Sequence, residues 1–247
     1  MEGVVVNEVY KSYGKGQRAS FAALRGISLS LGKGEFVSLT GESGCGKSTL
    51  ARLLIGLEEP DSGRVLLDGQ DTTGWSYRRW RPERRKIQAV FQDTSGTLNP
   101  MLSVYRNLEM ALVNLTDLNR RQRRGRIGGL MELTNMRPEL LEVPTRQLSG
   151  GEQRRIALLR ALSIRPDYLI LDEVISGLDL ISADAVLSLL ERYHREYDCA
   201  CLFITHDKES AYRISHRILE MSNGAIIREG TKNQRKREEE MEWKKAD

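Results

Sequence analysis

Residues 36–57 read FVSLTGESGCGKSTLARLLIGL, and this stretch decides the fold. An apolar segment, Phe36–Thr40, is followed by a glycine-rich loop, Gly41–Ser48, with the spacing G-x-x-x-x-G-K-[ST]. Leucines then recur at helical spacing over Leu50–Leu57, and Pro60 stops that pattern. The order of strand, loop and helix predicts a phosphate-binding loop, because the glycines let successive backbone N–H groups point at one anion.

The loop predicts a nucleotide and a metal ion as ligands. Lys47 is placed to reach the β- and γ-phosphates, and the Ser48 hydroxyl is a hard oxygen ligand for Mg²⁺. The predicted nucleotide-binding residues of this segment are Gly41, Glu42, Ser43, Gly44, Cys45, Gly46, Lys47, Ser48 and Thr49.

Composition limits the class of protein. The 247 residues carry 38 Lys and Arg against 34 Asp and Glu, a net charge of +4, which is too weak to indicate a nucleic-acid-binding protein. An apolar content of 40% is enough for a core, so wholesale disorder is excluded. We expect no signal peptide and no membrane-spanning helix. The three cysteines are too few for a disulfide framework.

Apolar runs predict further strands around the loop. They cover Val4–Val6, Arg64–Leu67, Tyr168–Leu171 and Cys201–Ile204, and a helical pattern over Ala183–Tyr197 separates the last two. This strand–helix–strand alternation predicts an α/β fold with a parallel sheet. Asn-Gly between apolar segments in residues 221–225 predicts a hairpin, whereas residues 93–165 have mainly helical patterns.

Two acidic residues follow the predicted strand Tyr168–Leu171. Parallel strands bind ligands at their carboxyl ends, so Asp172 is a candidate Mg²⁺ ligand. Glu173 is a candidate to orient or deprotonate a water molecule at the γ-phosphate. The alternative is an ordinary polar loop after a strand, and the phosphate loop upstream favours the functional interpretation.

The segment Leu148-Ser-Gly-Gly-Glu152 has two interpretations. Ser149 and Glu152 have the spacing of a capping box, which makes the segment simply the start of a helix. The second interpretation is an anion site, because Ser149, Gly150 and Gly151 leave a hydroxyl and backbone N–H groups at a positive helix end. A pair of glycines inside a cap destabilises a helix and favours the anion site.

Six motifs in one order resemble the nucleotide-binding subunit of ATP-binding cassette (ABC) transporters. They are GESGCGKS, VFQD with Gln92, LSGGE, LILDE, SGLD with Asp179, and ITH with His206. The resemblance covers about residues 5–230 and implies a P-loop NTPase (RecA-like) core with a mainly parallel sheet, an N-terminal antiparallel β subdomain and an inserted α-helical subdomain. The expected boundaries are 1–92 for the β subdomain and first half of the core, 93–163 for the helical subdomain, 164–231 for the rest of the core, and 232–247 for a charged tail.

The resemblance also implies roles for individual residues. Tyr13 would stack on adenine, and Gln92 would contact Mg²⁺ and the attacking water. His206 would contact the γ-phosphate and work with Glu173. Ser149–Gly151 would contact the ATP held by a second subunit, and Asp179 would lie at the interface between the two. Neither ATP site would then be complete in one chain.

Two positions depart from the usual family motif. Glu152 stands where glutamine is usual, and a carboxylate close to a triphosphate is unfavourable unless it turns into the capping box. Gly177 replaces the usual alanine, which we expect to be harmless.

Local strings resemble the peptide/nickel importer branch of the family. Phe91–Pro100 ends in the Leu-Asn-Pro of that branch, and Ser43–Glu58 and Ala200–Asp207 are most similar to the second ATP-binding subunit of nickel importers. The resemblance implies a second ABC ATPase as partner (a homologous heterodimer partner or a copy of this chain), two membrane permease subunits and, indirectly, a solute-binding protein. A permease helix would dock near Gln92–Val104, at the cytoplasmic face of the bacterial cell membrane. The solute would be nickel, a metal chelate or a small peptide.

Other functions share these motifs. Arginine-rich segments at 78–86 and 120–126 could bind nucleic acid, as in DNA-maintenance ATPases, but a solvated or partner-facing surface is the favoured interpretation. Such ATPases separate their motifs with coiled coils or zinc modules, which are absent here, so no nucleic-acid partner is expected. An exporter or lipoprotein-release ATPase is the other alternative. The tail, Lys232–Asp247, is expected to be a frayed helix or disordered.

Overall fold

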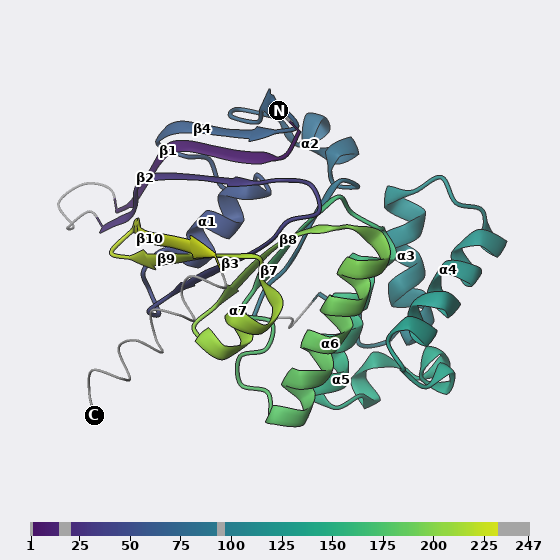
Figure 1. Cartoon of the computed structure of the whole chain (residues 1–247). Coiled ribbons are helices and arrows are strands. Elements are labelled where there is room, and N and C mark those ends of the chain that lie inside the picture. The colour runs from purple at the N-terminus through teal and green to yellow at the C-terminus, as the bar shows by residue number, and fades with distance from the viewer. Residues whose placement is uncertain (1, 15–20, 93–96, 232–247) are drawn as a thin grey trace, which may run out of the picture. The chain divides into compact units, whose positions relative to one another are not determined.

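The computed structural model describes residues 2–14, 21–92 and 97–231 (Figure 1). Backbone contacts divide the chain into two compact units. Unit 1 comprises Met1–Trp75 and Ala200–Asp247 as far as these are described, and unit 2 comprises Ser76–Cys199. Among the described residues, no helix combines the length and the apolar character that crossing a membrane requires.

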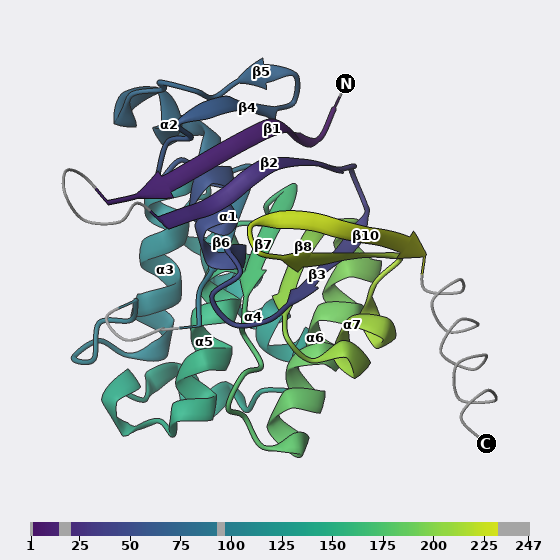
Figure 2. The same ribbon diagram turned by 90° about the vertical axis from the view of Figure 1, so that its left-hand side faces the viewer.

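Unit 1 contains an antiparallel sheet with the strand order β2-β1-β4-β5. Its strands are β1 (Val4–Tyr13), β2 (Phe21–Leu31), β4 (Ser62–Leu67) and β5 (Gln70–Asp71), and β1, β2 and β4 lie side by side in Figures 1 and 2. Burial alternates along the second half of β2, where Ile27, Leu29 and Leu31 point into the core. This period of two is the expected pattern for a sheet with one covered face.

The second group of strands in unit 1 is built around the phosphate-loop strand β3 (Phe36–Gly41). β3 pairs in parallel with β8 (Ala200–Thr205) on one side and with β9 (Arg217–Ser222) on the other, and β10 (Ala225–Thr231) pairs antiparallel with β9. All residues of β8 are buried, as is typical of a strand covered on both faces.

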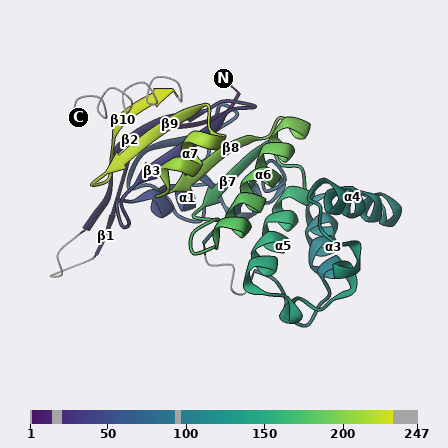
Figure 3. The same ribbon diagram turned by 60° about the horizontal axis from the view of Figure 1, so that its bottom comes forward.

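Helix α1 (Lys47–Leu54) follows β3 and packs against β2, and α7 (Lys208–Ile214) packs against β3 and β8 (Figure 3). The predicted apolar face of the first helix is wrong at Leu57, which is 58% exposed. The helix ends at Leu54 because Gly56 adopts a left-handed conformation with φ 64°.

Unit 2 contains a parallel pair of strands and most of the helices. The strands are β6 (Ile87–Val90) and β7 (Tyr168–Asp172). The helices are α2 (Tyr77–Glu83), α3 (Val104–Leu115), α4 (Arg120–Leu133), α5 (Gly150–Ser163) and α6 (Leu180–Tyr197), with short 3₁₀ turns at Pro138–Glu142 and Thr145–Gln147. Figure 3 shows α3 between α4 and α5, in agreement with their contacts.

The predicted fold class is confirmed, since the chain combines an antiparallel sheet, mainly parallel strands and helices. The predicted hairpin joins β9 to β10, with Asn223 and Gly224 both at positive φ (47° and 81°) as a two-residue turn requires. The four-part division at 92, 163 and 231 stays a prediction beside the two compact units. The tail, 232–247, lies outside the described residues.

Candidate functional site

The phosphate loop connects β3 to α1, and two of its glycines occupy positions where no other residue fits. Gly41 has φ 156° and Gly46 has φ 111°. A Cβ atom at Gly41 would lie 2.2 Å from the carbonyl oxygen of Met221, and one at Gly46 would lie 2.3 Å from that of Ala23. Backbone from β2 and β9 therefore presses against the loop, and only glycine fits at these two points.

Lys47 is enclosed by its own loop. It is 5% exposed, and its Nζ donates hydrogen bonds to the carbonyl oxygens of Gly41 (2.7 Å) and Glu42 (2.9 Å). The first turn of α1 contains no acidic residue. The ammonium group, the positive end of α1 and the loop N–H groups together form a site for an anion.

His206 lies at the same edge of the sheet as the phosphate loop. Thr205, the last residue of β8, is the register partner of Thr40, the residue before Gly41. Parallel strands end together, so the residues that follow them, His206 and the loop, are neighbours within unit 1. His206 is exposed at this edge.

Tyr13, the predicted adenine-stacking residue, is the last residue of β1 and is 37% exposed. Its hydroxyl donates to the Glu58 carboxylate and lies 3.4 Å from Oγ1 of Thr49, in the first turn of α1. Unit 1 therefore brings together three predicted elements, namely Tyr13, the phosphate loop and His206.

Asp172 and Glu173 lie in unit 2, where β7 ends. Asp172 is 3% exposed, whereas Glu173 is half-buried and has φ 53°. A left-handed conformation is unfavourable for a glutamate, and such strain is typical of residues that a functional site holds in place.

Gln92 is exposed and lies next to the loop that follows Glu173. Its Nε2 is 3.4 Å from the Ser176 hydroxyl oxygen, and Arg154 of α5 donates to the Ser176 carbonyl at 2.6 Å. Arg154 and Ser176 thus link Gln92 to α5, and sequence reasoning missed both. The sequence shows an arginine at position 154, but its hydrogen-bond partner, Ser176, lies 22 residues further along the chain, so no local motif connects the two.

The capping box predicted at Ser149 is present at the start of α5. The Ser149 hydroxyl accepts from the Glu152 N–H at 3.3 Å, and the Ser149 N–H and hydroxyl both donate to Glu152 Oε2 at 2.9 Å. These hydrogen bonds hold the pKa of Glu152 below its usual value. The carboxylate is therefore turned into the cap, while Gly150 and Gly151 provide the N–H groups of the first helical turn.

Asp179 caps α6. Its carboxylate accepts from the Ser182 N–H at 3.0 Å and from the Ser182 hydroxyl at 2.7 Å, which lowers the pKa of Asp179. The next two residues, Leu180 and Ile181, are 90% and 83% exposed. Two adjacent aliphatic side chains in solvent are typical of a contact surface.

The predicted site residues thus divide between the units. Unit 1 holds Tyr13, the loop 41–49 and His206, and unit 2 holds the others. The set in unit 2 consists of Gln92, Ser149, Gly150, Gly151, Asp172, Glu173 and Asp179.

The candidate Mg²⁺ ligands fit that ion by their chemistry. Ser48, Gln92 and Asp172 supply hydroxyl, amide and carboxylate oxygens, the donors that Mg²⁺ prefers. Within the described residues no group of three or more His, Cys, Asp or Glu side chains could hold a metal ion alone. Mg²⁺ in nucleotide sites needs only one or two protein ligands beside phosphate oxygens and water.

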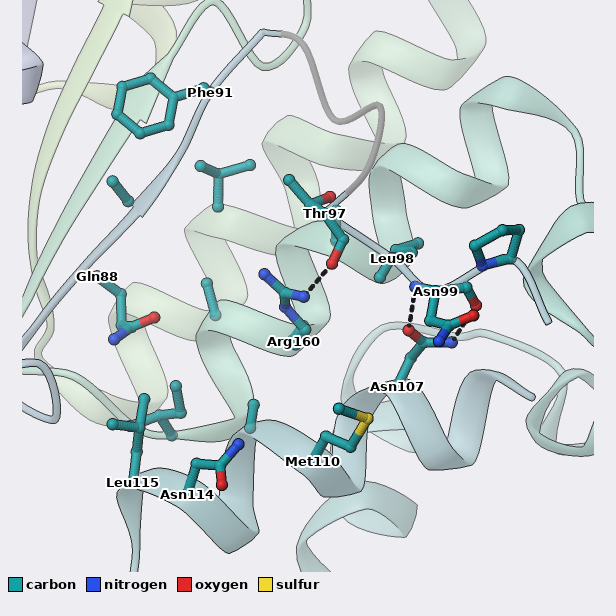
Figure 4. A pocket seen from close by; sticks show the side chains of 17 residues that line it. Gln88, Phe91, Thr97, Leu98, Asn99, Asn107, Met110, Asn114, Leu115 and Arg160 are labelled. Atoms are coloured by element: carbon teal, nitrogen blue, oxygen red, sulfur yellow. Dashed lines mark hydrogen bonds between the residues drawn. The ribbon is translucent and has the colours of Figure 1, made fainter. Parts of the chain in front are cut away.

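A pocket of about 700 Å³ lies within unit 2 among β6, α3 and α5 (Figure 4). The Arg160 side chain donates to the Thr97 carbonyl in this pocket, and burial lowers the pKa of Arg160. Asn107, which is 3% exposed, accepts from the Asn99 N–H at 2.7 Å and donates to the Asn99 carbonyl at 3.1 Å. Side chains of α3 and α5 therefore fix the segment from Thr97 to Pro100, which forms part of the wall.

Comparison with known proteins agrees with the resemblance found in the sequence. The family model described as ABC transporter matches residues 24–176. The nickel import ATP-binding protein NikE of Brucella suis is 40% identical over 90% of this chain and 84% of its own length. NikE of Shigella boydii is 39% identical over 86% of this chain and 79% of its own length.

Solved structures are similar over nearly the whole chain. The dimeric ATP-binding cassette MJ0796 bound to ADP and Pi is 29% identical, with a TM-score of 0.83, and the match covers 92% of this chain and 98% of that one. The cbiO1 protein of Clostridium perfringens, part of the ABC transporter complex cbiONQ, is 30% identical with a TM-score of 0.84. That match covers 96% of this chain and 92% of cbiO1.

Proposed function

This chain belongs to the ABC transporter family, and from that premise we propose that it is the ATP-hydrolysing subunit that energises nickel import. The cargo is nickel as the ion or as a chelate. The observation that supports ATP as the ligand is the enclosed Lys47 with the phosphate loop around it. The observation that supports nickel as the cargo is the 40% identity to nickel import ATP-binding proteins over 90% of the chain.

The residues of the loop hold the triphosphate. The Lys47 ammonium group exchanges its two carbonyl partners for phosphate oxygens, which are stronger acceptors because they are charged. Loop N–H groups and the N-terminus of α1 bind the same oxygens. Tyr13 supplies a ring for the base, and its position beside Thr49 supports this role.

Hydrolysis is assigned to polar residues at the ends of strands. Glu173 orients the attacking water and accepts its proton, and Gln92 orients the same water. His206 contacts the γ-phosphate from the end of β8. Ser48, Gln92 and Asp172 would hold Mg²⁺, which when bound neutralises charge on the phosphate oxygens.

A second ATPase subunit completes the site. Ser149, Gly150 and Gly151 head a helix in unit 2, where they can present N–H groups to the γ-phosphate of a nucleotide bound by another subunit. The exposed Leu180 and Ile181 beside Asp179 support a contact surface there. The partner is a homologous ATPase or a second copy of this chain.

Membrane permease subunits are the other partners, with a solute-binding protein acting through them. The pocket in Figure 4 is the docking site for a permease segment, supported by its size of about 700 Å³ and by its wall, Thr97–Pro100, within the predicted docking region. The subunit is then peripheral to the cytoplasmic face of the cell membrane.

Uptake of radiolabelled nickel tests the cargo. A strain that lacks this gene should lose nickel accumulation, and the wild-type gene should restore it, whereas the Lys47→Ala variant should not. Labelled di- and tripeptides are measured in the same strains. Normal nickel uptake with lost peptide uptake would replace nickel by peptides as cargo, and normal uptake of both would contradict the importer assignment.

A further inference from the structure

Two exposed aromatic side chains lie opposite each other where β1 ends and β2 begins. Tyr13 and Phe21 are register partners in this antiparallel pair. Directly opposite residues have their side chains on the same face of a sheet, with Cβ atoms about 5 Å apart. Phe21 is 58% exposed and Tyr13 is 37% exposed, and the Lys11 ammonium group lies over the Tyr13 ring, 5.8 Å from its centroid.

This face of the sheet is next to the phosphate loop. The Tyr13 hydroxyl lies 3.4 Å from Oγ1 of Thr49, directly after the loop. Two residues beyond Phe21, the carbonyl of Ala23 lies so close to the loop that a Cβ at Gly46 would be 2.3 Å from it. The two rings and the loop are thus neighbours within unit 1, as Figure 2 shows for β1, β2 and α1.

A polar network fixes the Tyr13 ring. Its hydroxyl donates to the Glu58 carboxylate, to which Arg52 Nε also donates at 2.6 Å. Arg52 Nη2 in turn lies 3.3 Å from Oγ1 of Thr49. Since Glu58 engages the hydroxyl, the tyrosine presents its ring, and not its hydroxyl, to a ligand.

We propose that Phe21 is a second stacking surface for the nucleobase, so that Tyr13 and Phe21 together form a two-ring platform. This inference rests on the proposed function, in which the loop 41–48 holds the triphosphate. The platform binds the base by stacking and apolar contact, which every base can make. A base whose ring system is large enough to cover both rings gains the most binding free energy.

Calorimetric titration of the full chain with ATP and with inorganic tripolyphosphate tests the platform. Tripolyphosphate probes the loop alone, because it has no base. Phe21→Ala should weaken ATP binding about tenfold, the usual effect of losing one stacking ring, and leave tripolyphosphate binding unchanged. Phe21→Trp should keep the wild-type affinity for ATP.

Tyr10→Ala is the matched control, since Tyr10 is an aromatic of the neighbouring strand β1, 47% exposed, whose register partner in β2 is Arg25. It should change neither affinity. Unchanged ATP affinity in Phe21→Ala overturns the proposal, and so does an equal loss for both ligands, which indicates damage to the loop. A wild-type chain that binds neither ligand contradicts the proposed function itself.

Discussion

Lys47 is the residue on which nucleotide binding depends most. Because the side chain is 5% exposed and hydrogen-bonded to the loop, Lys47→Ala removes a charge-assisted contact from the centre of the phosphate site. We expect ATP affinity to fall by about a hundredfold or more, measured by equilibrium dialysis. Lys33→Ala is the control, since Lys33 is 52% exposed and paired with Glu2 on the surface. ATP affinity retained by Lys47→Ala would exclude the loop as the phosphate site.

Glu173 tests the assignment of the base. Glu173→Gln keeps the size of the side chain but cannot accept a proton, so ATP should still bind while turnover falls about 10²- to 10⁴-fold. Phosphate release measures turnover. Glu196→Gln, on the exposed part of α6, should retain full turnover. If Glu173→Gln hydrolyses ATP at the wild-type rate, another group accepts the proton of the attacking water.

Single residues show where sequence reasoning succeeds. The loop 41–48, with its fixed spacing and flanking elements, was predictable because the whole motif is local. The bond between Tyr13 and Glu58 was not, because the two residues are 45 positions apart and neither has a motif that names the other. Arg154 and Ser176 were missed for the same reason.

The capping box at the start of α5 is the predicted feature that the structure describes in most detail. Ser149→Ala removes the hydroxyl that accepts from the Glu152 N–H, and should lower the free energy of unfolding by about 1 kcal/mol. Thermal unfolding followed by circular dichroism measures this. An unchanged midpoint would mean that the cap does not stabilise the helix.

The same cap has a pH dependence with a definite sign. The hydrogen bonds from Ser149 lower the pKa of Glu152 below the ordinary 4.5, so the carboxylate stabilises the folded state above that value. This contribution is lost as the pH falls through the folded pKa. Between about pH 7 and about pH 3, the wild type should therefore lose more stability than Glu152→Gln, whose amide does not titrate. Equal losses would contradict the pKa direction.

Among the elements, the strands formed by continuous apolar runs were predicted best. The runs at 36–40, 168–171 and 201–204 became β3, β7 and β8 because these strands are fully or almost fully buried. β2 was missed, since only its second half alternates between core and polar residues and its apolar run, Phe21–Leu24, is short and half alanine. α2 was missed because Trp80 is its one buried residue, which gives no helical period.

At the scale of the whole molecule, the proposed function has a consequence for assembly. In that proposal the chain binds ATP with its loop and presents the start of α5 to the nucleotide of another subunit, so we expect it to need a partner to hydrolyse ATP. Glu173→Gln should accumulate the assembled state, because ATP stays intact between the subunits.

Sedimentation velocity of Glu173→Gln with and without Mg·ATP is the most direct test of this account. The variant is measured alone and mixed with the homologous ATPase subunit of the same importer. We predict that Mg·ATP converts monomers to dimers in at least one of the two samples, and that ADP does not. Monomers alone, in both samples and at saturating Mg·ATP, would contradict the claim that a second subunit completes the site.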